Sequence, residues 1–105
     1  MRVWLYARLS GDDDPAQNSL QNQQEICRAF AEKRGDTIVG CSSDDNVSGM
    51  SFSRRGLDIL TAAVQAKQVD AVLVKDLSRL GRHRTQTALF IDFLRQQQVR
   101  VISVT

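Results

Sequence analysis

Four short apolar runs, separated by amphipathic segments of helical length, constrain the fold of this chain more than any other feature. The run over residues 71–74 is apolar throughout, which is typical of a strand buried on both faces of a parallel sheet. The other runs lie at residues 2–9, 37–41 and 99–104. This alternation favours parallel strands joined by helical crossovers. We therefore expect a three-layer α/β fold, with a mostly parallel sheet of four or more strands in the flavodoxin-like order 2-1-3-4 and flanking helices.

The segments between the first three runs predict two helices. Ser19 is a suitable N-cap for a helix over residues 20–34, and Gly35 is placed to end it. Ser53 or a neighbouring residue can begin the next helix, over residues 54–67. Each helix has apolar residues at spacings of three and four, so each can cover one face of the sheet.

A third helix is expected after a polar turn over residues 75–85, and it should end near residue 98. Its apolar belt is wider than one sheet face needs, so we expect a partner surface or a missing element to cover the excess. Residues 11–15 and 42–53 are polar and are expected to form loops. The chain stops on a strand, so we expect a fragment truncated from a larger protein.

The composition excludes several classes of protein. A length of 105 residues allows one domain. Two cysteines cannot build a disulfide framework, and no apolar run is long enough for a bilayer span or a signal peptide. We therefore expect a cytoplasmic protein without membrane association. The net charge of +2 does not by itself indicate nucleic-acid binding, but eleven of the fourteen basic residues are arginine, whose guanidinium can grip phosphate at two points.

One early serine and several arginines fall at the carboxyl ends of the predicted strands, where ligands bind in a parallel sheet. Arg8 and Ser10 are two residues apart on the first strand, so their side chains point the same way, and Tyr6 shares that face. The arginines that follow the later strands include Arg54, Arg79 and Arg82. The topology is therefore expected to bring a hydroxyl and several guanidiniums to one rim.

This combination suits phosphoryl transfer. A serine hydroxyl becomes a nucleophile when it is deprotonated or desolvated in a positive field. Guanidiniums would stabilise the negative charge that develops on a phosphodiester, so no metal or other cofactor is expected. Acyl transfer is disfavoured because His83 is the only histidine and no serine lies in a Gly-x-Ser-x-Gly elbow.

Other interpretations of these residues stay open. Ser10 could simply end a strand, residues 12–14 could be a solvated acidic loop, and Asp76 could cap the third helix. A receiver-type phospho-accepting signalling domain would use that loop and Asp76 to hold Mg²⁺, although it would leave Ser10 idle. A non-enzymatic α/β interaction module would use the arginines of the rim to bind an acidic partner.

Five segments, in order and spacing, resemble the motifs of the serine recombinases, the resolvase/invertase family. The segments are Tyr6-Ala7-Arg8-Leu9-Ser10, Ser19-Leu20-Gln21-Asn22-Gln23, Asp44-Asp45-Asn46-Val47-Ser48-Gly49, Arg54-Arg55-Gly56-Leu57 and Asp76-Leu77-Ser78-Arg79-Leu80-Gly81-Arg82. The last is the most diagnostic. It looks most like the large serine recombinases, the transposase and phage-integrase branch, because Ser78 stands where small resolvases place an aspartate.

The resemblance implies a role for each matching residue. Ser10 would attack a DNA phosphodiester, forming a 5′-phosphoseryl link and freeing a 3′ hydroxyl, and rejoining would need no ATP. The arginines that would bind the scissile phosphate are Arg8, Arg79 and Arg82, with Arg54 assisting. Asp45 and Gln23 would organise those groups, and Tyr6 would support the pocket.

The resemblance also implies the assembly around this segment. Residues 1–105 would form the catalytic domain of a site-specific DNA recombinase, which in this family acts as a homodimer that pairs into a tetramer. The segment lacks the long dimerisation helix and the DNA-binding domains of the family. It is therefore expected, on its own, to bind DNA weakly and not to recombine it.

Overall fold

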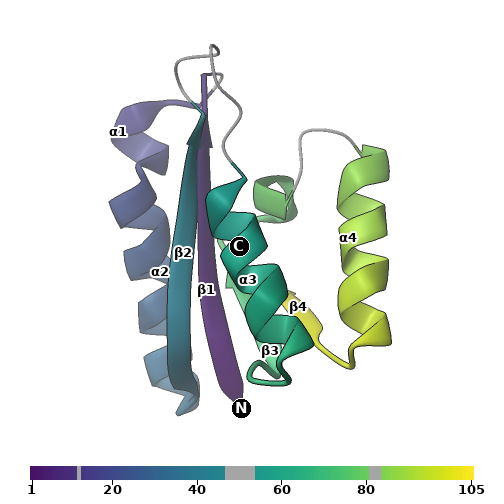
Figure 1. The fold of residues 1–105 in the computed structure, drawn as a ribbon. Helices are drawn as coiled ribbons and strands as arrows, with labels where there is room; N and C mark the ends of the chain where they lie inside the picture. The colour runs from purple at the N-terminus through teal and green to yellow at the C-terminus, as the bar shows by residue number, and fades with distance from the viewer. Residues whose placement is uncertain (12, 47–53, 81–83) are drawn as a thin grey trace.

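The computed structural model describes residues 1–11, 13–46, 54–80 and 84–105. Strands and helices alternate along these segments (Figure 1). In chain order they are β1 (Arg2–Ser10), α1 (Pro15–Asn18), α2 (Leu20–Arg34), β2 (Thr37–Asn46), α3 (Arg55–Gln65), β3 (Ala71–Val74), the 3₁₀ turn η1 (Leu77–Leu80), α4 (Arg84–Gln96) and β4 (Arg100–Ser103).

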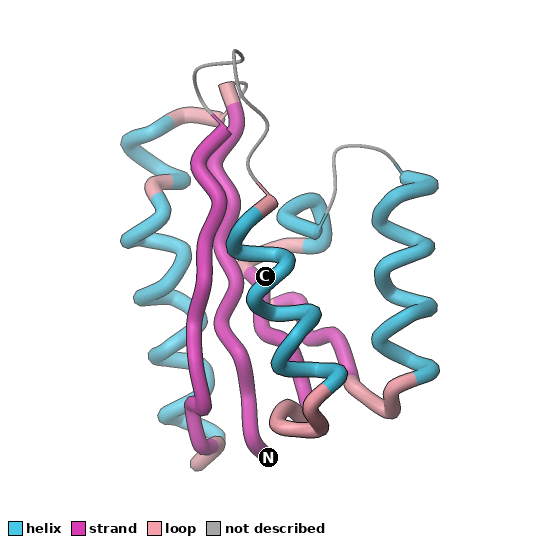
Figure 2. The backbone as a smooth tube through the Cα atoms, viewed as in Figure 1, coloured by secondary structure: helices cyan, strands magenta, loops and turns pink. Residues whose placement is uncertain are grey.

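The four described strands form one parallel sheet in the order β2-β1-β3-β4, which confirms the predicted topology. At the centre of the sheet Leu5 of β1 pairs with Cys41 of β2 and with Leu73 of β3. Helix α2 covers one face, and α3 and α4 lie over the other (Figures 1 and 2). The carboxyl ends of β1 and β2 therefore lie at the same edge of the sheet.

The core divides into two clusters because alternate residues of a strand face opposite sides of the sheet. Trp4 and Tyr6 of β1 pack with α3 and α4, whereas Val3 and Leu5 pack with α2. All four residues of β3 are buried, as expected for a central strand that is covered on both faces.

The first long helix has the ends that its sequence predicts. Ser19 Oγ accepts a hydrogen bond from Asn22 N at 3.1 Å, which satisfies one of the free amides of the first turn. Gly35 ends α2 in the left-handed conformation, at φ 76°, and its N–H bonds to the carbonyl groups of the last turn. The predicted helix over residues 20–34 is confirmed.

Strand β2 is longer than predicted. It continues to Asn46, so residues 42–46 form strand rather than the expected loop. The reason is that β1 is itself long and pairs with β2 up to Ser10 opposite Asn46. Polar side chains stabilise this extension, since Trp4 Nε1 donates to Ser42 Oγ at 2.9 Å. The remainder of the predicted loop, including Ser53, lies outside the described residues.

Other boundaries differ locally from the prediction. The single-turn helix α1 (Pro15–Asn18) was not expected, and it overlaps the predicted loop over residues 11–15 only at Pro15. The polar turn after β3 contains η1. Helix α4 ends at Gln96, and one apolar side chain of its belt, Leu89, is 65% exposed, so part of this belt is left uncovered by the described residues. None of the described helices combines the length and the apolar character needed to cross a membrane.

Candidate active site

The site is built around the carboxyl end of β1, where Arg8 pairs with Asp44 of β2. The Arg8 side chain is buried, and its guanidinium donates to two backbone oxygens of η1, Ser78 O and Arg79 O. These contacts join residues about seventy positions apart in the sequence. They place η1 beside the carboxyl end of β1, as the topology predicts.

The Arg79 side chain contacts both the backbone of Arg8 and two carboxylates. Its Nη1 donates to Arg8 O at 2.7 Å, and its Nη1 and Nη2 bind the Asp13 carboxylate at 2.8 and 3.0 Å. Its Nε lies 3.4 Å from Asp76 Oδ1. The Asp13 carboxylate raises the pKa of Arg79 above its usual value, so the guanidinium stays charged. A buried arginine at this position is a built anion-binding group rather than a solvated surface charge.

The predicted nucleophile lies against the same carboxylate. Ser10 donates to Asp13 Oδ2 from its backbone N at 2.8 Å and from its Oγ at 3.1 Å. Asp13 Oδ2 thus contacts both the Ser10 hydroxyl and the Arg79 guanidinium. The structure therefore brings Arg8, Ser10 and Arg79 together, as their places after the predicted strands indicate.

The interpretation of residues 12–14 as a solvated loop is wrong for Asp13. Only 12% of its side chain is exposed, and the Arg79 guanidinium holds the pKa of its carboxyl at about 2. An acidic side chain three residues after a strand-ending serine can turn back onto that serine, which is the one sequence signal that could have found it. Asp12 lies outside the described residues.

Gln23 is fully buried and holds the backbone of Arg8. Its Oε1 accepts from Arg8 N at 3.2 Å, and its Nε2 donates to Arg8 O at 2.9 Å and to Asn18 O at 2.8 Å. The predicted site glutamine thus lies within the cluster. Its contacts are with the main chain of Arg8, so it fixes the path of β1 as the strand enters the site.

Tyr6 binds a carboxylate that the set of predicted site residues did not include. Its hydroxyl donates to Asp44 Oδ2 at 2.7 Å, and burial together with this contact raises the Tyr6 pKa well above its ordinary value. Asp44 is 2% exposed and also accepts from Gly56 N at 2.8 Å and Leu57 N at 3.0 Å. It therefore serves the first turn of α3 as a cap that comes from β2.

Asp45, the predicted site carboxylate, is exposed, whereas its neighbour Asp44 is buried. Successive residues of a strand point to opposite sides, so only one of the pair can face Tyr6. Buried carboxylates need hydrogen-bond donors, and α3 supplies two backbone amides to Asp44. The register of β2 therefore determines that Asp44, and not Asp45, faces Tyr6. The spacing of the motif alone does not distinguish the two residues.

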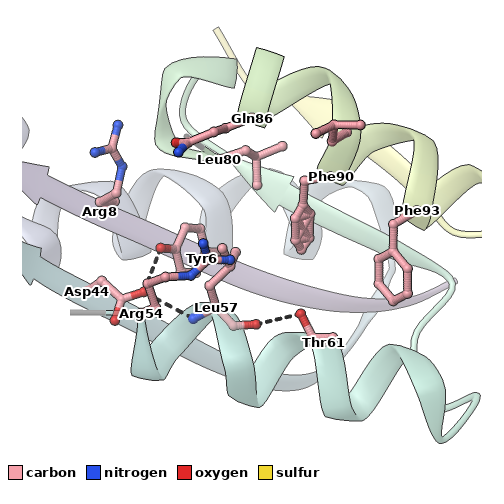
Figure 3. Close-up of a pocket in the computed structure, with 11 residues that line it drawn as sticks. Tyr6, Arg8, Asp44, Arg54, Leu57, Thr61, Leu80, Gln86, Phe90 and Phe93 are labelled. Atoms are coloured by element: carbon pink, nitrogen blue, oxygen red, sulfur yellow. Dashed lines mark hydrogen bonds between the residues drawn. The ribbon is translucent and has the colours of Figure 1, made fainter. Parts of the chain in front are cut away.

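Arg54 lies just before α3, and its side chain is exposed. It lines a cavity of about 350 Å³ together with Tyr6, Arg8 and Asp44 (Figure 3). The other end of this cavity is apolar, where Phe90 and Phe93 of α4 face α3 across it. Arg82, the remaining predicted phosphate ligand, lies outside the described residues.

One interpretation expected Asp76 to cap the third helix, α4, and this is wrong. Its Oδ1 accepts from Ser78 N at 3.0 Å at the start of η1, and α4 begins only at Arg84. Of the three carboxylates that a Mg²⁺-binding signalling site would use, Asp12 lies outside the described residues. The other two, Asp13 and Asp76, contact Arg79. A guanidinium at the centre of these carboxylates repels a metal cation and opposes the receiver interpretation.

Comparison with known proteins gives the same family from sequence and from structure. The family model "Resolvase, N terminal domain" matches residues 3–105. The chain is 33% identical over 104 residues to the Tn3 transposon resolvases of Escherichia coli and Klebsiella pneumoniae, covering 99% of this chain and 49% of each resolvase. The chain thus spans about half the length of these curated relatives.

Solved structures with the same fold come from several kinds of serine recombinase. A resolvase-family site-specific recombinase from Streptococcus pneumoniae superposes with a TM-score of 0.84 at 28% identity, covering 99% of this chain and 72% of that one. The catalytic domain of TP901-1 integrase gives 0.83 at 26% identity, with 99% and 77% coverage. The catalytic domain of ISC1926 TnpA, an IS607-like serine recombinase, gives 0.83 at 26%, with 100% and 68% coverage.

Proposed function

The chain belongs to the resolvase family of serine recombinases, and from this premise we propose that it is the catalytic domain of a site-specific DNA recombinase. One observation carries the proposal. The hydroxyl of Ser10 and the guanidinium of Arg79 meet at a single anionic oxygen, 3.1 and 2.8 Å away. A nucleophile and a two-point anion clamp at one position are what attack on a phosphodiester requires.

The proposed reaction is a transesterification. Ser10 Oγ forms a bond to phosphorus, its proton passes to water, and the bond from phosphorus to the 3′ oxygen breaks. The products are a 5′-phosphoseryl link and a free 3′ hydroxyl, which takes up a proton. The reverse attack by a 3′ hydroxyl restores both the DNA and the serine, so strand exchange conserves the number of phosphodiester bonds and needs no ATP.

The arginines have separate positions around this reaction. Arg79 contacts the same Asp13 oxygen as Ser10 Oγ, and Arg8 donates to the backbone of η1. Arg54 lines the adjoining cavity at the start of α3. We propose that these groups, with Arg82, stabilise the charge that develops on the scissile phosphate, where preorganised donors have their largest effect.

Three further residues position these groups. Gln23 holds the main chain of Arg8, and Tyr6 links β1 to the cap of α3 through Asp44. Asp45, exposed at the end of β2, is proposed to act from the DNA side of the site. The contacts of Gln23 are with main-chain atoms and that of Tyr6 is with Asp44, so both are positioning residues.

We propose DNA as the partner, with homodimers that pair into a tetramer during strand exchange. The membership of the family and the clamp at Ser10 support this assignment, and the exposed apolar Leu89 of α4 fits a subunit contact. A cytoplasmic location is proposed because both cysteines, Cys27 and Cys41, are free thiols, as expected in a reducing compartment.

The test is a trapping experiment with the complete product of the gene that encodes this chain. Incubation with nicked (suicide) duplex DNA in EDTA should give a covalent protein–DNA adduct whose 5′ phosphate is attached to Ser10, identified by mass spectrometry of the digested adduct. Ser10→Ala should abolish the adduct, whereas Ser43→Ala, an exposed serine of β2, should retain it. An adduct that still forms with Ser10→Ala would show that Ser10 is not the nucleophile.

A further inference from the structure

Four hydrogen bonds converge on the carboxylate of Asp13. Two come from the Arg79 fork, at 2.8 and 3.0 Å, and two come from Ser10, from N at 2.8 Å and from Oγ at 3.1 Å. We propose that Asp13 stands in the place of the scissile phosphate in the resting protein, and that it must leave this place before DNA can engage Arg79 and Ser10. The inference rests on the proposed function, because it concerns the regulation of the same site.

The contacts of Asp13 are those expected of a bound phosphate. A guanidinium holds carboxylate and phosphate in the same two-point geometry, so the Arg79 fork accepts either group. The nucleophile is also in place, since an acceptor oxygen lies 3.1 Å from Ser10 Oγ. The Asp13 carboxylate thus accepts hydrogen bonds from both groups that would bind a phosphodiester, the Arg79 guanidinium and the Ser10 hydroxyl.

Asp13 and a phosphate cannot use this position together. The Arg79 side chain is only 8% exposed, and its Nη1 is already shared between Arg8 O and Asp13 Oδ2. A second anion would lie within a few ångströms of the first, where like charges repel strongly in a partly buried site. Binding of a phosphate to Arg79 therefore requires the carboxylate to move away.

A role for Asp13 as the general base does not fit its surroundings. Arg79 keeps the pKa of this carboxyl at about 2, and a group that holds a proton so weakly accepts one poorly near neutral pH. The same charge makes Asp13 a persistent occupant, because it stays ionised under any condition in which DNA binding would occur. Its chemistry therefore favours occupation of the site over proton transfer.

The position of Asp13 in the chain allows it to leave without opening the core. It lies in the short link between β1 and α1, where Asp13 N bonds to Ser10 O at 3.1 Å in a turn. Its described neighbours in this link, Gly11 and Asp14, are exposed. A change in this link would break the turn and the Asp13 contacts but would leave the buried strand residues in place.

The proposal is tested by titrating inorganic phosphate into the 105-residue protein at pH 7 and following the Arg79 Nε–H resonance by NMR. The comparison is between wild type, Asp13→Asn and the matched control Asp14→Asn, which removes one charge from the same link. We expect Asp13→Asn to bind phosphate at least about five-fold more tightly than wild type, because the internal competitor is weakened. Asp14→Asn should remain within about two-fold of wild type.

Wild type supplies a second, independent measurement. Saturating phosphate should shift the Ser10 amide resonance together with that of Arg79, because the bond from Ser10 N to Asp13 breaks when Asp13 leaves. Phosphate that reaches Arg79 without changing the Ser10 amide overturns the proposal, as does an Asp13→Asn protein that binds phosphate no more tightly than Asp14→Asn. Should Asp13→Asn fail to fold by circular dichroism, Asp13→Ser replaces it, and the wild-type measurement decides in every case.

The failure of this inference is distinguishable from failure of the proposed function. A negative phosphate titration would leave the Ser10 adduct intact as evidence for the nucleophile. An adduct that survives Ser10→Ala would remove the nucleophile and would leave the competition between Asp13 and phosphate measurable. The two experiments therefore fail separately.

Discussion

The side-chain amide of Gln23 pairs with the backbone of Arg8 as a neighbouring strand would, accepting from its N–H at 3.2 Å and donating to its carbonyl at 2.9 Å. In the described part of the chain β3 pairs with β1 only from Val3 to Leu5. Beyond Leu5 the backbone of β1 needs other partners, because buried amides are costly when unpaired. Gln23 supplies them at Arg8, and so fixes the main chain of β1 as the strand enters the site.

We expect Gln23→Ala to destabilise the protein by about 2 kcal/mol, because the buried N–H of Arg8 loses its acceptor and a cavity is left behind. Urea unfolding followed by circular dichroism measures this change. The control is Gln21→Ala on the same helix, where the exposed amide contacts only Glu25 among the described residues and the cost should stay within about 0.5 kcal/mol. Equal losses for the two variants would contradict the bridging role of Gln23.

The fold was predictable from the sequence because its strong signals are periodic. The apolar run of β3 and the capped helix α2 each match one physical pattern, and alternation of such elements fixes a parallel sheet. The end of β2 was not predictable in this way. Residues 42–46 are polar, and their strand conformation follows from pairing with β1, which is a long-range contact.

The candidate site was predictable in its residue types and less so in its contacts. Arg8 and Ser10 lie at the carboxyl end of β1, and Arg79 follows β3, so the three meet at one edge of a parallel sheet, which a sequence pattern can show. Asp13 and Asp44 could not be assigned in the same way. The contact of Asp13 with Ser10 depends on the conformation of one turn, and the burial of Asp44 instead of Asp45 depends on strand register. Residue spacing predicts neither property.

The ion pair of Asp13 with Arg79 predicts a pH-dependent stability. The carboxyl titrates near 3.8 in the unfolded chain and at about 2 in the folded protein, so the pair stabilises the folded state fully only above the higher value. The shift corresponds to about 2 kcal/mol. Wild type should exceed Asp13→Asn by roughly this amount at pH 7, and the difference should disappear as the pH falls from about 4 to about 2. Urea unfolding of both proteins at pH 7 and at about pH 2 measures this difference in stability. A difference that stays constant with pH would exclude the ion pair as its cause.

Asp44 joins three elements, and its removal should be among the more damaging single changes in the chain. Asp44→Ala leaves the Tyr6 hydroxyl and two amides of α3 without their acceptor in a buried place, and we expect a loss of about 3 kcal/mol or more. Tyr6→Phe removes only one of these bonds and should cost about 1 kcal/mol. Thermal and urea unfolding show which variant loses more stability. A larger loss of stability for Tyr6→Phe than for Asp44→Ala would contradict the capping role of Asp44.

Gly56 lets α3 approach β2 closely. A Cβ at this position would lie 2.5 Å from Ser43 O, a backbone atom that cannot turn aside. Gly56→Ala should therefore destabilise the protein by about 1–3 kcal/mol, although alanine favours helix over glycine by about 1 kcal/mol. The control is Asp58→Ala, at an exposed position of the same helix, where we expect less than about 1 kcal/mol. A Gly56→Ala protein as stable as wild type would show that α3 can shift away from the strand.

The fork of Arg79 should matter more than its charge. Arg79→Lys keeps one positive charge but loses the two-point geometry with which Asp13 is now held and with which a phosphate would be held. We expect the rate of Ser10–DNA adduct formation in the complete gene product to fall by a factor of about 100 or more, as when one preorganised donor is removed from a transition state. Arg28→Lys, at an exposed position of α2, should leave the rate within about two-fold of wild type. Single-turnover measurements at saturating DNA separate this loss from weaker binding, and an Arg79→Lys rate equal to that of Arg28→Lys would show that charge alone suffices at this position.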